Sequence, residues 1–292
     1  MAEVSRAKTL FVVAVGRQIR FFGTAAGGAL RSADAAYSNG ARNHRSAVSD
    51  RRQVAVTGRG WRASAGAWIA SLGDEGDFTR QYVTDSAMVA RIEGRAFGAA
   101  LDVGCGEGRF CRILHGLGVA ATGVDPTPRL IEEAVRREPS GHYRIGRAEA
   151  LDFPSAAFDL VVSYLTLIDI PGLEEALSEM VRVLAPGGTL LIANLASFTT
   201  AGAEVGWTKA ADGSRLHFAL DRYLEERAIE VEWEGIRIVN WHRPLSRYLG
   251  LLLEQGLRLV HFAEPRASGP DPQEILDYER VPWAYVMEWR KD

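Results

Sequence analysis

The sequence predicts an α/β protein built around a doubly wound sheet. Short apolar runs bounded by glycine or proline alternate with amphipathic stretches along most of the chain. This alternation is typical of parallel strands joined by right-handed crossover helices on both faces of a sheet. A glycine-rich turn follows the first of these apolar runs. With 292 residues, 47% of them hydrophobic, the chain can form one large domain of this kind.

Folded structure is expected from Trp61 onward, over residues 61–292. Helices are predicted at residues 64–69 and 78–95, before the first strand. Strands are predicted at residues 99–103, 120–124, 142–146, 158–164, 189–195, 257–264 and 283–289, with helices at 109–117, 129–138, 173–184 and 245–255. The proline and two glycines at residues 186–188 mark the end of helix 173–184.

Residues 196–244 interrupt the alternation and predict a β-rich insertion after the fifth strand. Within residues 229–234, apolar side chains alternate with three glutamates, and Gly235 follows. This pattern is typical of a hairpin with one apolar and one charged face. We expect the glutamates to face solvent, Val231 and Trp233 to face inward, and the insertion to cover the ligand-binding edge of the sheet.

Residues 1–60 differ in composition from the rest of the chain. They carry ten Lys and Arg against three acidic residues, and their Ala/Gly/Ser/Arg-rich tract lacks enough apolar surface to offset the entropy of ordering. Three interpretations remain open: a leader translated upstream of the true start, a transit-type presequence, or a disordered arm. A presequence would imply a mitochondrial location, and the other two interpretations a cytoplasmic one. No apolar run reaches the roughly 18 residues that a membrane span needs.

The charge and the cysteine content limit the classes of partner and the cellular compartment that the sequence allows. The net charge is −3, so the surplus of seven positive charges in residues 1–60 leaves −10 for residues 61–292. An acidic domain argues against nucleic acid as a partner. Cys105 and Cys111 do not form a disulfide framework, and no Cys/His spacing predicts a metal site. A reducing, intracellular compartment is the simplest interpretation.

The most informative motif is a glycine loop at residues 99–109. An apolar strand ends in Gly104-x-Gly106-x-Gly108, and a helix follows. Glycines are needed where the backbone turns sharply and a ligand approaches it closely. In a doubly wound sheet this loop lies at the carboxyl end of the first strand, where ligands bind. Asp125 ends the second strand, where a carboxylate can accept both hydroxyls of a ribose. The loop and this acid together predict an adenosine-containing ligand.

Nicotinamide cofactors also contain adenosine, so the spacing of the glycines is needed to distinguish a nicotinamide enzyme from other adenosine-binding proteins. Nicotinamide enzymes favour G-x-G-x-x-G, whereas the glycines here occupy alternate positions and Arg109 follows them. Asp102 precedes the first glycine. A carboxylate there would repel a pyrophosphate and attract a sulfonium or amino group. The motif therefore favours S-adenosylmethionine (SAM) over a nicotinamide cofactor.

Residues 101–109 resemble motif I of the class I SAM-dependent methyltransferases, and Asp125 resembles their ribose-binding acid. Residues 146–154 resemble the loop that flanks the adenine, residues 158–163 resemble motif IV, and residues 182–188 resemble the segment before strand five. The likeness is strongest to the small-molecule group called methyltransferase type 11. It implies a Rossmann-like methyltransferase fold with seven strands, the last antiparallel. It also implies methyl transfer from SAM to oxygen or carbon of a small-molecule acceptor.

The same resemblance implies further cofactor contacts. These are Ala148, Glu149 and Ser163. Two positions depart from the group's pattern. Arg147 stands where an Asp is often found in the adenine loop, so that contact falls to the neighbouring residues. Ile168 and Asp169 stand where many members carry two histidines, so the role of those histidines is not carried over.

Such an enzyme needs little catalytic machinery, because a base is required only if the acceptor must lose a proton. The candidate bases are His242, Tyr223 and Asp169. His242 also has a structural interpretation as a hydrogen-bonded histidine, and Asp169 has one as a surface or helix-capping acid. The aromatic residues that could wall an acceptor pocket, or simply pack the insertion and the N-terminal helix, are Trp207, Phe218, Trp233, Trp241, Trp61 and Trp68. The alternatives to a methyltransferase are a non-catalytic SAM-binding module and an NAD(P)-dependent oxidoreductase.

Deletion of residues 1–53 tests the separation of the leader from the domain. The melting temperature and the affinity for SAM should both stay unchanged, because that segment lacks a core of its own. Thermal unfolding and calorimetry measure the two quantities. A drop of several degrees on truncation would show that the leader packs on the domain.

Overall fold

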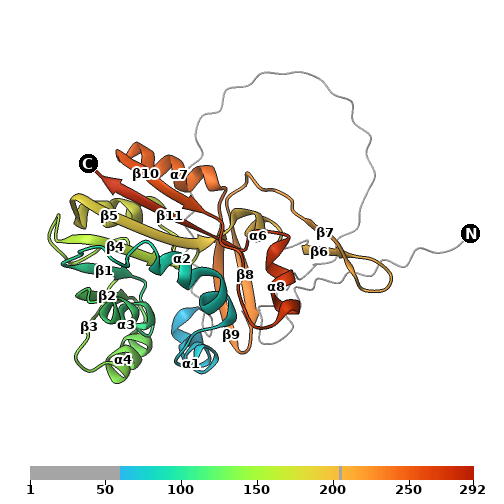
Figure 1. The fold of residues 1–292 in the computed structure, drawn as a ribbon, viewed down its shortest axis with the longest axis horizontal. Coiled ribbons are helices and arrows are strands. Elements are labelled where there is room, and N and C mark those ends of the chain that lie inside the picture. Colours follow the sequence, from blue (N-terminus) through green and yellow to red (C-terminus); the bar gives the residue numbers. More distant parts are fainter. Residues whose placement is uncertain (1–59, 204–205) are drawn as a thin grey trace, which may run out of the picture.

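The computed structural model describes residues 60–203 and 206–292, so the predicted leader lies outside the described residues apart from Gly60. Within the described part, one sheet has seven strands in the order β10-β11-β5-β4-β1-β2-β3 (Figure 1). Its strands are β1 Ala100–Val103, β2 Ala121–Asp125, β3 His142–Ile145, β4 Phe158–Tyr164, β5 Leu184–Leu195, β10 Leu257–Ala263 and β11 Ala284–Lys291. Strands β3, β2, β1, β4 and β5 pair in parallel, and β11 runs antiparallel to both of its neighbours. The predicted fold class, with its antiparallel last strand, is confirmed.

Helices and a second set of strands complete the described elements. The helices are α1 Trp61–Leu72, the π-helix η1 Arg80–Thr84, α2 Asp85–Val89, α3 Arg109–Gly116, α4 Pro128–Arg137, α5 Leu173–Val183, α6 Ser197–Ala201, α7 Leu245–Glu254 and α8 Pro272–Glu279. The strands outside the main sheet are β6 Gly206–Lys209, β7 Arg215–Ala219, β8 Arg227–Trp233 and β9 Ile236–His242. Among the described helices, none is both long enough and apolar enough to cross a bilayer.

Two apolar layers cover the two faces of the sheet. Leu101, Val161 and Ile192 pack with residues of α5 and α7 on one face. Leu160 and Val162, their neighbours along β4, pack with residues of α2 and α3 on the other face. Successive residues of a strand point to opposite faces, so a strand covered on both sides is apolar throughout. Each of these fully buried side chains contributes about 1.5–3 kcal/mol.

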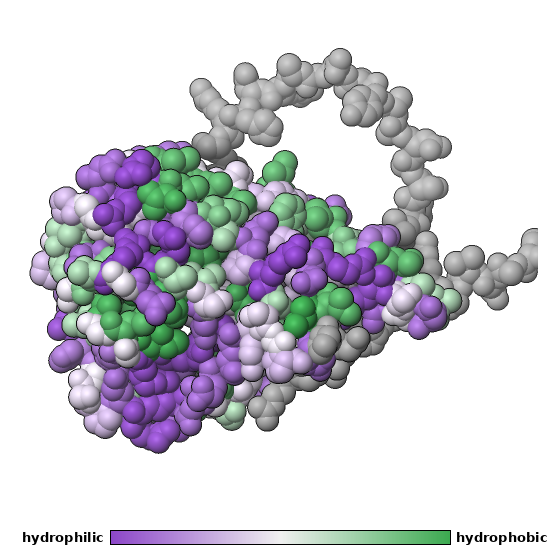
Figure 2. Space-filling view, in the orientation of Figure 1, coloured by the Kyte–Doolittle hydropathy of each residue, from purple (hydrophilic) through white to green (hydrophobic). Residues whose placement is uncertain are grey.

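Polar and apolar residues are unevenly distributed over the surface of the molecule (Figure 2). Hydrophilic residues cover the side of the molecule that carries α4, whereas an apolar patch lies over β10 and the end of α7. The apolar side chains exposed there are Leu253, Leu259, Val260 and Phe262. β10 is an edge strand, so its outer side chains have a neighbouring strand on one side only.

The predicted helix at residues 78–95 is wrong in its extent. It forms η1 and α2 in succession and ends at Val89. The Thr84 hydroxyl donates to the carbonyl of Thr79, five residues earlier, at 3.2 Å. Threonine hydroxyls compete with backbone donors for helix carbonyls in this way, and wide turns of this kind are common beside functional sites.

The fifth strand also begins earlier than predicted. β5 starts at Leu184, directly after α5, rather than at residue 189. Leu184 pairs with Phe158, and the register between β4 and β5 then shifts. Gly187, with φ of 71°, lies within the extra residues. The proline and glycines therefore end the helix as expected, but they form an irregular strand start rather than a loop.

The insertion forms hairpins in the described residues, as predicted. β8 pairs with β9, and the turn between them has positive φ at Glu234 and Gly235, 45° and 80°, as a two-residue hairpin turn requires. Burial alternates along β8 as expected: Val231 is buried and Trp233 half-buried, while the residues facing solvent are Glu230, Glu232 and Glu234. The prediction for this hairpin is confirmed.

The apolar face of this hairpin packs against α1 rather than against the sheet. In Figure 1 α1 lies alongside β8 and β9. Buried β8 and β9 side chains form one cluster with Trp61, Ala67 and Trp68 of the helix. The backbone N–H of Gly60 donates to the carbonyl of Arg237 at 2.8 Å, and Ser64 bonds to the same residue. The helix and the hairpin therefore form one wall beyond the carboxyl ends of β1 and β4.

Candidate active site

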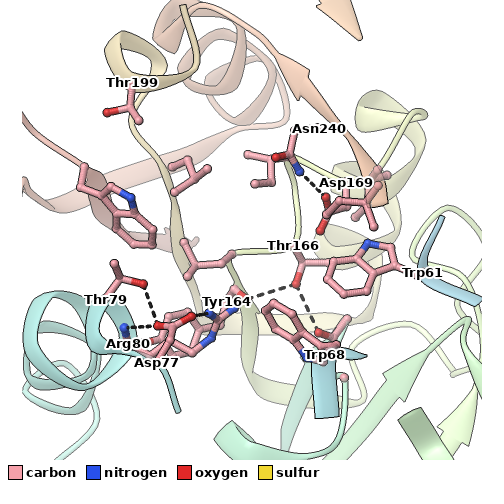
Figure 3. Close-up of a pocket in the computed structure, with 18 of the residues that line it drawn as sticks. Trp61, Trp68, Asp77, Thr79, Arg80, Tyr164, Thr166, Asp169, Thr199 and Asn240 are labelled. Atoms are coloured by element: carbon pink, nitrogen blue, oxygen red, sulfur yellow. Dashed lines mark hydrogen bonds and ion pairs between the residues drawn. The ribbon is translucent and has the colours of Figure 1, made fainter. Parts of the chain in front are cut away.

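A cavity of about 350 Å³ lies between the carboxyl ends of β1, β2 and β4 and the wall made by α1 and the insertion (Figure 3). Its lining combines the glycine loop, the ends of the strands, and aromatic side chains of the wall. The lining includes Gly104, Gly106, Asp125, Ala148, Glu149, Thr166, Asp169, Trp61, Trp68, Trp207, Phe218, Trp233 and Asn240. This place, where the strand order reverses between β1 and β4, is where doubly wound sheets bind ligands.

The glycine loop brings backbone to the cavity without side chains. Gly104 has φ of 78°, and a Cβ there would lie 2.1 Å from Cγ2 of Thr166. Its N–H donates to the Val124 carbonyl at 2.7 Å, which fixes the loop to β2. Gly106 also has positive φ, 56°, and its N–H donates to the Asp125 carboxylate at 3.2 Å. Another residue type at Gly104 would clash, so the loop requires glycine for both conformation and space.

Asp125 lies at the end of β2 and is 7% exposed. Its oxygens accept from the backbone N–H of Gly106 at 3.2 Å and of Thr127 at 2.8 Å. Burial raises the pKa of Asp125. An ionised carboxylate offers about four acceptor positions, so Asp125 can accept from a further donor besides these backbone groups and the Thr127 side chain. The side chain therefore fits the pair of hydroxyls of a ribose, as the sequence predicts.

Asp102 forms the wall of a smaller adjoining cavity of about 50 Å³. The side chain is 1% exposed. One oxygen accepts from the Cys111 thiol at 3.6 Å, and the other has no hydrogen-bond partner among the described residues. Burial raises the pKa of Asp102 to about 7, and the charges of Glu107 and Asp125 act in the same direction. A buried carboxylate with an orphaned oxygen fits a cationic group of a ligand.

The remaining predicted cofactor contacts divide into two groups. Ala148 and Glu149 line the cavity, and Glu149 forms an ion pair with Arg147 at 2.9 Å. Arg147 is the residue that departs from the family's pattern. Ser163 and Gly108 do not line the cavity as the described residues form it. Ser163 is fully buried within β4, and Gly108 approaches the ring of Tyr143. The geometry supports a structural role for these two.

Of the three candidate bases, all within the described residues, Asp169 alone lines the cavity. One carboxylate oxygen accepts from Nδ2 of Asn240 at 2.6 Å, and the two side chains point toward one another in Figure 3. Burial raises the pKa of Asp169 to about 8 and outweighs the hydrogen bonds from Asn240 and Trp61, which lower it. The charge of Asp125 adds to the increase.

His242 and Tyr223 lie outside the cavity lining. His242 is fully buried, with Nδ1 bonded to Thr200 at 2.7 Å and Nε2 to the Tyr223 carbonyl at 2.8 Å. The Tyr223 hydroxyl accepts from the backbone N–H of Leu245 at 3.2 Å, and its ring stacks on Phe198. With both ring nitrogens engaged inside the protein, the geometry favours the structural interpretation of His242, and the contacts of Tyr223 fit a packing role.

Sequence reasoning missed the residues that hold Asp169 in place. The loop after β4 is joined to β9 by the Trp241 N–H, which donates to the Ile168 carbonyl at 2.6 Å. Arg243, 2% exposed, donates to the carbonyls of Leu167 at 3.1 Å, Ile170 at 2.7 Å and Pro171 at 3.2 Å. The residues around Arg243 include other polar and basic side chains, so no local pattern signals this role in the sequence.

The predicted aromatic residues mostly face the cavity. Trp68 contacts Trp61 with ring centroids 5.0 Å apart and Trp233 at 6.4 Å, which forms one aromatic wall. Trp207 and Phe218, whose ring centroids are 5.4 Å apart, also line the cavity and come from the β6–β7 hairpin of the insertion. Trp241 is absent from the lining and packs against the Arg243 guanidinium instead. Such a wall suits an apolar or aromatic acceptor.

This fold, with a glycine loop, a strand-two acid and an orphaned buried carboxylate, defines a class I SAM-dependent methyltransferase. Residues 101–192 match the family model Methyltransf_11, described as a methyltransferase domain. The chain belongs to this family, the type 11 group of SAM-dependent methyltransferases, and its cofactor is SAM.

Relatives and solved structures agree with this assignment. The chain is 30% identical to a malonyl-[acyl-carrier protein] O-methyltransferase of Enterobacter lignolyticus over 202 residues, which cover 68% of this chain and 79% of the relative. It is 38% identical to a ubiquinone biosynthesis O-methyltransferase of Methylocella silvestris over 122 residues, 37% of this chain and 46% of the relative. The crystal structure of a SAM-dependent methyltransferase from Mesorhizobium loti is similar, with a TM-score of 0.66, 25% identity and coverage of 75% and 100%.

Replacing Asp125 by Ala should weaken SAM and S-adenosylhomocysteine binding by roughly 1–3 kcal/mol, because ligand hydroxyls would lose a buried partner. Calorimetry measures the affinity, which should have a stoichiometry of one. The exposed Asp152 provides the control, since Asp152→Ala removes an acid outside the cavity lining. Equal affinities of the wild type and Asp125→Ala would refute the role of Asp125.

The affinity for SAM should rise as the pH increases through about 7, because a cationic ligand binds the ionised form of Asp102. The Asp102→Asn variant should lose this part of the pH dependence. The amino group of SAM titrates identically in both experiments, so the difference between the two curves isolates Asp102. Parallel curves of log affinity against pH for wild type and variant would contradict the assignment.

Proposed function

We propose that this methyltransferase transfers the SAM methyl group to an oxygen atom of a small, largely apolar or aromatic acceptor, and that Asp169 accepts the acceptor's proton. The observation that carries the proposal is the position and environment of Asp169. Its carboxyl group lines the cavity, is held by Asn240, and has its pKa raised to about 8.

A hydroxyl oxygen must lose its proton as it gains a methyl group. General bases work best when their pKa lies near the working pH, and burial is the usual means of bringing a carboxyl group into that range. Asp169 meets this condition, whereas the rings of His242 and Tyr223 are occupied inside the protein. The names of the two relatives, both O-methyltransferases, support oxygen as the acceptor atom.

The same cavity and the smaller one beside it also contain the residues expected to bind the cofactor. We propose that Asp102, Gly104, Gly106, Asp125, Ala148 and Glu149 hold the cofactor. When bound, SAM supplies an already activated methyl group on a sulfonium. The chain then has to align the acceptor and keep water away. The aromatic wall of Trp61, Trp68 and Trp233 provides the apolar, enclosed surface for both tasks.

Replacing Asp169 by Asn should lower kcat by about 10²–10⁴-fold, the usual contribution of a general base, and leave SAM affinity unchanged. In the wild type, activity should rise with pH as Asp169 ionises, with a midpoint below about 8 because the bound cationic donor favours the ionised carboxylate, and the variant should lose this rise. Transfer of labelled methyl from SAM to a panel of phenols and catechols measures both. Asp152→Asn is the matched control. Full activity with an unchanged pH profile in Asp169→Asn would refute the proposal.

Asn240 offers a second test of the same assignment. Its hydrogen bond lowers the pKa of Asp169, so Asn240→Ala should move the rise in activity to higher pH. A purely structural role for Asn240 would lower activity equally at every pH. The two outcomes separate a positioning effect on Asp169 from a general loss of folded protein.

A further inference from the structure

Two guanidinium groups line the smaller cavity beside Asp102. They belong to Arg80 on η1 and Arg109 at the start of α3. All three side-chain nitrogens of Arg109 already donate within the protein. Nε donates to the Glu75 carbonyl at 2.8 Å, and both terminal nitrogens donate to the Asp85 carboxylate. Arg109 therefore serves the fold by joining the start of α3 to the segment that precedes it.

The Arg80 guanidinium is engaged on one edge only. Nη1 donates to the Asp77 carboxylate at 2.5 Å, and the guanidinium lies over the Trp68 ring, 4.8 Å from its centroid. Within residues 60–203 and 206–292, Nε and Nη2 donate to no other group. A guanidinium carries five N–H donors in a planar fork, so a second carboxylate can bind to Arg80 beside Asp77.

Asp77 fixes the position of this guanidinium. One of its carboxylate oxygens accepts from the Thr79 hydroxyl at 2.7 Å and from the Arg80 backbone N–H at 2.8 Å. The other oxygen accepts from Nη1. The ion pair on one edge and the Trp68 indole on one face hold the Arg80 side chain in a single place. A side chain that is already ordered loses little entropy when it binds an anion.

Arg80 lies where the two cavities meet. The residues that line both the larger and the smaller cavity are Trp68, Arg80, Gly104, Gly106 and Tyr164. In the view of Figure 3, Arg80 lies across the larger cavity from Asp169. The guanidinium therefore belongs to the side of the site that carries the glycine loop, away from the candidate base.

The smaller cavity offers groups of opposite charge. Asp102 contributes a carboxyl oxygen that has no partner among the described residues, and Arg80 contributes guanidinium donors. In the same part of the chain, the two side chains form no ion pair with each other. An α-amino acid carries an ammonium and a carboxylate on one carbon, so it would satisfy both side chains at once. SAM carries such a group at its methionine end.

We propose that Arg80 binds the α-carboxylate of the cofactor while Asp102 binds its ammonium group, so that the smaller cavity selects a cofactor with an intact amino acid. This inference rests on the part of the proposed function that places the cofactor between Asp102 and Asp125. Arg80 precedes residues 101–192, which match the family model, so the family match does not assign this role. The position of Arg80, which is set by Asp77, carries the inference.

Two stable ligands that differ in one carboxylate test the assignment. S-adenosylhomocysteine has the complete amino acid, and S-adenosyl-3-thiopropylamine lacks only its carboxylate. Calorimetry on the full chain should show about 10–100-fold tighter binding of S-adenosylhomocysteine, the usual contribution of a hydrogen bond between charged groups. Arg80→Gln should remove or reverse this preference. Its affinity for 5′-methylthioadenosine, which lacks the whole amino acid, should stay unchanged.

Two further variants complete the experiment. Arg129→Gln removes an exposed guanidinium outside both cavities and should retain the preference. If Arg80→Gln does not fold, Arg80→Lys keeps a cation beside Asp77 and should still lower the preference, because an ammonium lacks the planar fork of N–H groups. An unchanged preference in either folded Arg80 variant, or an equal loss in Arg129→Gln, overturns the inference.

Failure of this inference is distinguishable from failure of the proposed function. Asp169→Asn should retain the preference, because Asp169 lies across the cavity, so a loss of methyl transfer does not bear on Arg80. Asp125→Ala should weaken the binding of both ligands. Unchanged affinities in Asp125→Ala would refute the placement of the cofactor. Weaker binding in Asp125→Ala, combined with an intact preference in Arg80→Gln, would refute the role of Arg80 alone.

Discussion

The buried guanidinium of Arg243 joins the end of the insertion to the loop after β4. It lies just after β9 and donates to three carbonyls of the loop after β4. Buried carbonyls without partners are costly, and a buried charge without partners is more so, so each satisfies the other. Glu226, 3.6 Å away, balances the charge. Because the loop carries Asp169, the position of the candidate base depends on this contact with the insertion.

Electrostatics explains why this cavity suits a cationic methyl donor. Asp102 and Asp169 have pKa values raised to about 7 and about 8, first by burial and in part by the charge of Asp125. The charge of Asp125 disfavours the ionised forms of both Asp102 and Asp169, so a cation that binds beside these carboxyl groups stabilises them. Binding of the donor should therefore favour the ionised form of Asp169, which is the form that can accept a proton.

The sequence by itself determined the sheet and the glycine loop. Both depend on local patterns: apolar runs of strand length, glycines at a tight turn, and the alternation that gave the hairpin of β8 and β9 one charged face. Local patterns were insufficient where tertiary contacts decided the backbone. The Thr84 hydroxyl, inside the wide helical turn of η1, bonds to the Tyr164 hydroxyl on β4 at 2.6 Å, and pairing with Phe158 draws Leu184 into a strand.

The tertiary structure alone decided which candidate residues meet. His242, Tyr223 and Asp169 are all candidate bases in the sequence, but their surroundings come from segments far apart in the chain. Asn240, 71 residues from Asp169, reaches its carboxyl group, while Thr200 and the Tyr223 carbonyl occupy the nitrogens of His242. The type of a residue determines which chemistry its side chain can perform. Burial and hydrogen-bond partners, which only folding supplies, decide whether that side chain is available to a ligand.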